Sequence, residues 1–279
     1  MAFARRLDSG RVSPYPHLRM ARADGLQTGE WRYAGKSAVR MYSSFFYWLL
    51  REPFPIRQLG DQIARVILEA FGTMVVAAIV QGAMFGWLAG WYGAKFSVIY
   101  WSGAAGIFLI LSESTTMVGA MIFAARIGTG FTVEIGAMQM TSLLDVLRLM
   151  AVEPTQQIVI PRVLAAILCL PLLKALTDAV AIVAAMIFGF AFFDISVPIF
   201  LQHAFSILTP RILTTSYIRC AIMAFFVGMN ACGLGFYFQG GAVELGKTTT
   251  KSIVINLIVV IIVDTTYGIL DSMLGWSVV

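Results

Sequence analysis

The chain has 279 residues, of which 59% are hydrophobic and 13% are charged, and its mean hydropathy is +0.82. Soluble domains carry roughly 25% charged residues, so this composition excludes a soluble globular protein and predicts an integral membrane protein. The formal net charge of +5 does not indicate nucleic-acid binding, because the basic residues gather in the first 65 positions and beside the apolar runs, without a recognition motif.

The first 65 residues are expected to lie outside the hydrocarbon core. Residues 1–35 are polar, rich in Arg, Gly and Pro, and lack the apolar core of a signal peptide, which predicts a cytoplasmic tail. Residues 36–65 contain an apolar, aromatic run flanked by basic residues. That run is too short to span a membrane, so we expect an N-terminal interfacial helix followed by a connector.

Five apolar segments follow, and each is long enough at 1.5 Å per residue to cross about 30 Å of hydrocarbon. They cover residues 66–91, 98–124, 160–190, 212–238 and 252–275. We therefore predict one all-α membrane domain over residues 66–279 with its termini on opposite sides. Because most basic residues lie in the N-terminal region and in the connections after the second and fourth segments, we expect a cytoplasmic N-terminus and a C-terminus on the opposite side of the membrane.

A row of glycines lies in the first segment, where Gly82, Gly86 and Gly90 recur every four residues. Small residues at this spacing let a second helix approach closely. The partner helix can belong to the same bundle or to a second copy of the chain, and the sequence leaves both possibilities open.

Polar residues interrupt the second segment at Ser112, Glu113, Thr115 and Thr116. A carboxylate at this depth is costly unless it faces protein or a hydrated cavity, so Glu113 is predicted to line an interior. The alternative is a structural hydrogen bond between helices. Asp264, in the fifth segment, has the same two interpretations.

Lys174 and Asp178 lie four residues apart in the third segment, which places them on one helical face. A paired couple facing the bundle interior is the conservative interpretation, and a proton relay is the alternative.

The stretch over about residues 133–154 separates the second and third segments. From Met140 its apolar residues follow the i, i+3, i+4, i+7 pattern of an amphipathic helix, and Asp145 and Arg148 fall on the other face. We expect a short cytoplasmic helix that lies on the lipid surface or docks a soluble partner.

Enzyme chemistry has little support. The three cysteines lie in apolar runs without metal spacing, and the two histidines are isolated. Residues 240–248 resemble a phosphate-binding loop but are one residue too long and follow no predicted strand. We therefore expect no metal, no cofactor and no catalytic residue in this chain.

Residues 123–173 resemble the signature region of the MlaE/YrbE family, the permease subunits of ABC-type lipid transporters that work with MCE-domain proteins. The matching features of the family are a glycine-containing turn, an Ala/Thr-x-Glu-Ile-Gly run, a helix with acidic residues, a turn ending in proline and a Pro-Arg pair. They occupy residues 128–130, 133–136, 143–150 and 150–154, and Pro161 with Arg162.

A second match is the Gly- and Thr-rich stretch before the last segment, so the resemblance covers about residues 50–275. One departure concerns the Arg-Glu-Leu-Gly-Pro motif common in the family. This chain retains its glutamate as Glu113 but has Ser112 in place of the arginine and lacks the Gly-Pro break.

The resemblance implies that the helix over about residues 133–154 is a coupling helix seated on a cytoplasmic ATPase, with Glu134, Asp145, Arg148 and Glu153 as contact candidates. It implies a lipid cavity lined by Glu113, Ser112, Thr115 and Thr116. The implied partners are an MlaF-like ATPase that holds ATP and magnesium, an MlaD-like MCE protein, phospholipid and a second copy of the chain. A STAS-domain protein is a further implied partner.

The resemblance favours the permease of an ABC-type lipid transporter in an inner (plasma) membrane. The alternative is an ion- or proton-coupled secondary transporter that uses Glu113, Lys174, Asp178 and Asp264. A membrane scaffold without transport activity is a third interpretation.

Overall fold

The computed structural model describes residues 42, 45, 56–96, 99–150, 153–193, 195–198, 200–202 and 209–273. The predicted tail over residues 1–35, most of the predicted interfacial helix and both histidines lie outside these residues. Tyr42 and Phe45 are helical, and their rings lie 5.8 and 5.9 Å from the ring of Phe225.

Five long helices form a bundle, and no strand occurs in the described part of the chain. The bounds are α3 (Ile56–Lys95), α4 (Ile99–Leu109), η1 (Ile110–Ser114), α5 (Thr115–Phe123), η2 (Ala124–Gly128), α6 (Thr129–Met140), α7 (Leu143–Leu149), η3 (Thr155–Val159), α8 (Ile160–Phe193), α10 (Pro210–Phe236) and α11 (Ala242–Met273). The segments from α4 to α6 follow one another as the second long helix. An all-α membrane protein with five spanning helices is therefore confirmed.

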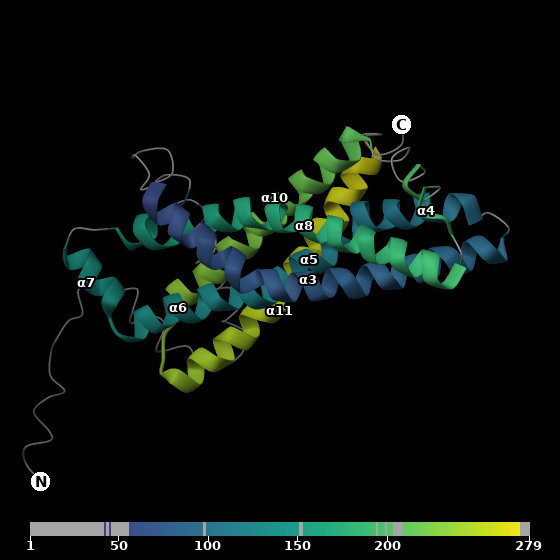
Figure 1. The fold of residues 1–279 in the computed structure, drawn as a ribbon. Coiled ribbons are helices and arrows are strands. Elements are labelled where there is room, and N and C mark those ends of the chain that lie inside the picture. Colours follow the sequence, from purple (N-terminus) through teal and green to yellow (C-terminus); the bar gives the residue numbers. More distant parts are fainter. Residues whose placement is uncertain are drawn as a thin grey trace, which may run out of the picture.

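The helices alternate in direction (Figure 1). The first helix, α3, begins at the end of the bundle where α7 lies, whereas α11 ends at the opposite end. The short α7 lies beyond α6 and α8 and connects the second long helix to the third.

Several helices extend further toward the α7 end than the apolar segments predicted. The second candidate span covers 36 residues, Ala105–Met140, which is about 54 Å of helix against about 30 Å of hydrocarbon. The connector expected before residue 66 is the first part of α3, and the Gly- and Thr-rich stretch is helical from Ala242. Helices do not end at the membrane boundary, because neighbouring helices continue to pack beyond it.

The predicted coupling helix also differs from the structure. The residues from Val133 to Met140 continue the second long helix as α6, and the chain breaks at Ser142, which has a positive φ of 59°. Only Leu143–Leu149 form the separate helix α7. Apolar periodicity continues through this break, so the pattern alone does not reveal it.

The main core lies among the second long helix, α8 and α10, where Phe123, Ile127, Ile160, Met223 and Val227 are fully buried. The outer helices are less covered by the rest of the chain. In an apolar 18-residue stretch of α3 and of α11, 22% and 17% of the residues are buried, against 50% in the second long helix.

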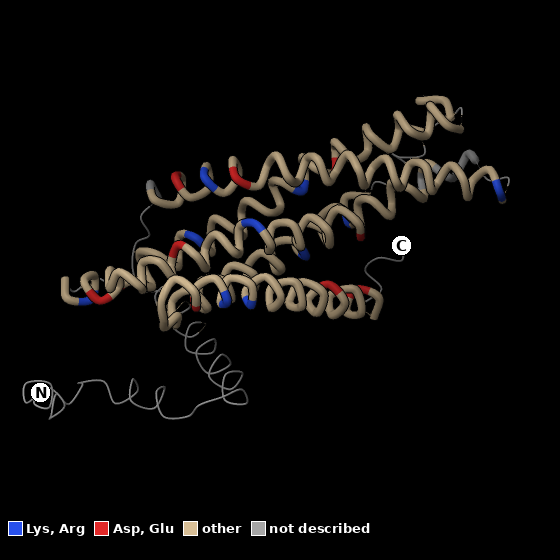
Figure 2. Tube along the Cα trace, turned by 90° about the horizontal axis from the view of Figure 1, so that it is seen from below, with Lys and Arg blue, Asp and Glu red and all other residues tan. Residues whose placement is uncertain are grey.

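Charged residues are more frequent in the half of the bundle where α7 lies than in the opposite half (Figure 2). This asymmetry matches the expectation that basic residues mark one end of the molecule.

Candidate functional site

The second long helix contains two short π-helical segments, η1 and η2, and each carries a charged residue. Glu113 lies in η1 and Arg126 lies in η2. A π-helical turn inserts an extra residue and rotates the following side chains, and such turns are frequent at functional sites.

Glu113 is held by Arg219 of α10. The Arg219 guanidinium donates to both Glu113 carboxylate oxygens, at 3.2 and 3.0 Å, and lies 2.6 Å from Oδ1 of Asp264 on α11. It also donates at 3.4 Å to the main-chain carbonyls of Ser112 and Asp264. One cation thus joins three membrane helices.

The two carboxylates have different environments. The side chains of Arg219 and Asp264 are 8% and 10% exposed, whereas that of Glu113 is 56% exposed. Asp264 therefore fixes the arginine inside the bundle. The Glu113 carboxylate, which is paired with the same arginine, reaches the surface of the chain.

A second polar cluster lies deeper, between the second long helix and α8. Lys174 Nζ lies 2.7 Å from an Asp178 carboxylate oxygen, with side chains 1% and 6% exposed. Thr115 donates to Asp178, and Lys174 donates to the carbonyl of Leu111. The interpretation of Lys174 and Asp178 as an interior pair is confirmed.

The predicted cavity residues do not share one surface. Ser112 and Glu113 reach the surface, but Thr115 and Thr116 are 2% and 0% exposed, and Thr115 bonds the buried Asp178. Thr115 and Thr116 therefore do not share the exposed surface of Glu113 within this chain, and their place in a lipid cavity stays a prediction. Consecutive polar residues on a helix point in different directions, so only part of the run can line one cavity.

The predicted coupling residues also separate into two groups. Asp145 and Arg148 form an exposed pair on α7 at 2.9 Å, and Glu153 is exposed beyond it. Glu134, by contrast, lies on α6, where its carboxylate binds the buried Arg162 of α8 at 2.8 Å and Arg65 of α3 at 3.1 Å. It ties three helices together next to α7.

The glycine row faces α8 within the same chain. A Cβ on Gly82 would lie 2.2 Å from the carbonyl oxygen of Ala181, and one on Gly86 would lie 2.5 Å from that of Ala185. A Cβ on Gly90 would meet the ring of Phe193. Of the two possibilities left open by the sequence, the structure contains the contact inside the bundle.

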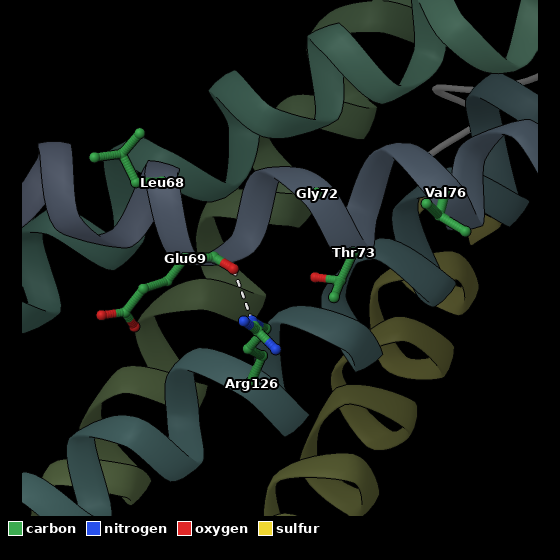
Figure 3. A pocket seen from close by; sticks show the side chains of 6 residues that line it. All are labelled: Leu68, Glu69, Gly72, Thr73, Val76 and Arg126. Carbon is green, nitrogen blue, oxygen red and sulfur yellow. Dashed lines mark hydrogen bonds between the residues drawn. The ribbon is translucent and has the colours of Figure 1, made fainter.

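Arg126 lies in an open groove at the α7-side half of the bundle (Figure 3). The groove is lined by Leu68, Glu69, Gly72, Thr73, Val76 and Arg126. It continues into a second hollow, which shares Glu69, Thr73 and Arg126 and adds Ile122, Ala125, Thr129, Gly130, Val133 and Thr249. Residues of α3, the second long helix and α11 thus surround one cation.

Sequence reasoning missed three arginines that organise the site, Arg126, Arg162 and Arg219. Of these, only Arg162 was singled out from the sequence, as part of the Pro-Arg pair that resembles the family. Arg219 nevertheless lies inside the predicted fourth segment, and a charge within an apolar run was the available signal. Among the described residues, no group of His, Cys, Asp and Glu could hold a metal ion.

The fold and the site define a polytopic helical membrane protein with charged residues paired between its spanning helices. The family described as Permease MlaE matches residues 59–270. The chain therefore belongs to the MlaE permease family.

Similar proteins carry permease names. The chain is 31% identical over 162 residues to "Probable ABC transporter permease protein ycf63" of Pyropia yezoensis, covering 58% of this chain and 62% of that protein. It is 24% identical over 234 residues to "Protein TRIGALACTOSYLDIACYLGLYCEROL 1, chloroplastic" of Arabidopsis thaliana, covering 83% and 64%. It is 23% identical over 215 residues to "Probable ABC transporter permease protein RP096" of Rickettsia prowazekii (strain Madrid E), covering 77% and 83%. The chain thus spans less than two thirds of the first two relatives.

Proposed function

We propose that this chain is the transmembrane permease subunit of an ABC-type transporter that moves phospholipid or a related lipid between the inner membrane and an MCE-protein channel. The observation that carries the proposal is the half-exposed Glu113, fixed by the buried Arg219 beside an apolar surface. A polar group next to an apolar wall suits an amphipathic ligand, whose headgroup and chains need different surroundings.

The outward side of the second long helix supports this assignment. Between Ser114 and Arg126 its partly or fully exposed residues are apolar: Met117, Val118, Gly119, Met121, Ile122 and Ala125. Glu113 and Arg126 are about 20 Å apart along the helix at 1.5 Å per residue. The names of the relatives agree with lipid transport, since one contains the name of a diacylglycerol lipid and two name an ABC transporter permease.

ATP and magnesium are assigned to a separate, MlaF-like subunit. The stretch over residues 240–248 is helical from Ala242, and no strand precedes it in the described part of the chain. A phosphate-binding loop requires the strand–loop–helix context, so this stretch does not supply one. No cofactor is proposed for this chain.

The coupling element is the short helix α7 together with the cluster around Glu134. Asp145, Arg148 and Glu153 offer exposed charges to the ATPase. Glu134 connects α6 to α3 and α8, so we assign it to transmitting the movement of α7 rather than to direct contact. ATP binding would then shift these helices as rigid bodies.

Two copies of the chain would enclose the lipid between them, because five helices offer little interior space for a lipid with two acyl chains. The α7 end would be cytoplasmic, with the N-terminus on that side and the C-terminus in the periplasm, as the charge asymmetry favours. An MlaD-like MCE protein would receive the lipid on the outer side, and a STAS-domain protein would join the ATPase.

The charge balance around Arg219 favours a second candidate, an ion- or proton-coupled transporter. Two carboxylates, Glu113 and Asp264, share one guanidinium. A transported cation or proton could therefore neutralise the negative charge of the second carboxylate. Lys174 and Asp178 already neutralise each other and add little to this alternative.

The test is an affinity purification from mild detergent with mass spectrometry of proteins and lipids. The variant is the double charge reversal Asp145→Lys with Arg148→Glu. It preserves an opposite-charge pair within α7, although in the order that the helix dipole disfavours by about 0.3–1 kcal/mol per charge, and it inverts the charge pattern offered to a partner. The control is Arg211→Glu, an exposed change on α10 at the opposite end of the bundle.

We expect the wild type and the control to retain an ATPase, an MCE protein and phospholipid, and the double variant to lose the ATPase alone. Recovery of the wild type without an ATPase, together with substrate movement driven by a pH gradient, would favour the ion-coupled alternative. Equal ATPase recovery in all three proteins would remove α7 from the interface.

A further inference from the structure

The groove around Arg126 has the features of a phosphate-binding site at the membrane surface. Its two adjoining hollows measure about 490 and 690 Å³. Leu68 and Val76 on α3 and Ile122 and Val133 on the second long helix form its apolar walls, and Arg126 lies where the two hollows meet.

The Arg126 guanidinium is positioned but not neutralised. Its Nε donates to the main-chain carbonyl of Glu69 at 2.7 Å, which fixes the plane of the group. The Glu69 carboxylate points away from it (Figure 3) and lies 3.9 Å from Arg65. Within the described part of the chain, neither Nη atom of Arg126 has a hydrogen-bond partner.

The threonine hydroxyls of the groove already donate to main-chain carbonyls and are not available to an anion. Thr73 and Thr249 donate their hydroxyl protons to the carbonyls of Ala70 and Leu245, and Thr129 donates within its own helix. The available donors are therefore the two Nη groups, which match the paired oxygens of a phosphate in a bidentate geometry.

The level of Arg126 along the bundle indicates which phosphate groups could reach the groove. Moving from the α7 end toward the opposite end, four helices each carry a charged residue that is followed by at least eleven uncharged residues. These residues are Glu69, Arg126, Arg162 and Lys251. They mark the boundary between the hydrocarbon and the polar layer on the α7 side, which is the depth of the phosphates in the adjacent leaflet.

We propose that this groove binds the phosphodiester of a phospholipid from the leaflet on the α7 side. Arg126 binds the phosphate, and the apolar walls contact the parts of the acyl chains next to the headgroup. This inference rests on the proposed lipid transport and adds a binding site remote from Glu113. A lipid held here would lie at the start of the apolar surface that leads to Glu113.

The experiment measures lipid binding to the purified chain by native mass spectrometry, without the ATPase. The probes are phosphatidylglycerol and a diacylglycerol with the same acyl chains, which differ in the phosphate-containing headgroup. The variants are Arg126→Gln, the conservative Arg126→Lys and the control Arg211→Gln, an exposed arginine outside the groove. Thermal unfolding of each variant checks its fold.

We expect Arg126→Gln to weaken phosphatidylglycerol binding by about tenfold, the loss expected when charge-assisted hydrogen bonds disappear, and to leave diacylglycerol binding unchanged. Arg126→Lys should retain an intermediate affinity because it keeps the charge but loses the bidentate geometry. The control should bind both lipids as the wild type does.

The arms of the experiment separate the possible failures. Unchanged phosphatidylglycerol binding by Arg126→Gln would overturn the groove assignment and leave the proposed function standing. A wild type that binds neither lipid would count against the proposed function itself. Millimolar inorganic phosphate should not displace phosphatidylglycerol, and complete displacement would identify a site for free phosphate instead of a lipid.

Discussion

At the residue scale, Arg219 determines the different roles of Glu113 and Asp264. The buried guanidinium needs a buried partner, and Asp264 supplies it with a side chain only 10% exposed. Glu113 is 56% exposed and remains available to a ligand. The first carboxylate therefore supports the fold, and the second belongs to the site.

This difference predicts losses of stability of different size for two conservative substitutions. Asp264→Asn removes the buried partner of Arg219 and should approach the loss of about 3–5 kcal/mol typical of a broken buried pair. Glu113→Gln removes a half-exposed partner and should cost less than about 1 kcal/mol. Unfolding in mixed detergent and SDS micelles measures both, and an equal loss would assign Glu113 a structural role.

The charged residues inside the apolar segments were predictable, but their partners were not. Glu113, Lys174, Asp178 and Asp264 each stand out because charges are rare in spanning helices. The sequence paired only Lys174 with Asp178, because these two are neighbours on one helix. The Arg219 contacts join residues 45 and 106 positions apart, and only the packing of helices brings them together.

At the element scale, the contact between α3 and α8 depends on the absence of side chains along the glycine row. Gly82 and Gly86 approach main-chain carbonyls of α8, which cannot move without separating the helices. Close approach of this kind increases van der Waals contact, the main attraction between helices in lipid.

Gly82→Ala should therefore destabilise the bundle by about 1–3 kcal/mol, as overpacking does. The matched control is Gly60→Ala on the same helix, where a Cβ would meet no atom within 4 Å. That change should be neutral or stabilise by up to about 1 kcal/mol, because alanine restricts the unfolded chain. Comparing the unfolding of the two variants tests the contact, and equal effects would argue against it.

The π-helical segments and the break before α7 had no signal in the apolar pattern. The second long helix reads as one continuous run, but η1 and η2 each shift the register of the side chains that follow. This shift helps to explain why Glu113 reaches the surface while Thr115 and Thr116 are buried. It also limits how well a periodicity argument can assign cavity residues.

At the scale of the whole molecule, the arrangement gives the two ends of the bundle different tasks. The α7 end combines the exposed pair Asp145–Arg148 with the Glu134 cluster and the Arg126 groove. The middle of the bundle holds Glu113 and its partners. A movement of α7 can reach the membrane helices through Glu134, which contacts both α3 and α8.

The proposed orientation can be tested with single cysteines in intact cells. The native thiols Cys169, Cys220 and Cys232 are at most 1% exposed, so they should contribute little background. Asp145→Cys on α7 should react with a membrane-impermeant maleimide only after the membrane is opened. Lys95→Cys, at the opposite end of α3, should react in intact cells, and the reverse pattern would invert the topology.

The sequence by itself determined the class of protein, the five spanning helices and most of the charges that matter, because hydropathy and length directly constrain which segments cross a bilayer. Tertiary structure decided which partners those charges have, which polar side chains are buried and where α7 begins. These features depend on helix rotation and on contacts between distant segments, and a one-dimensional apolar pattern does not encode either.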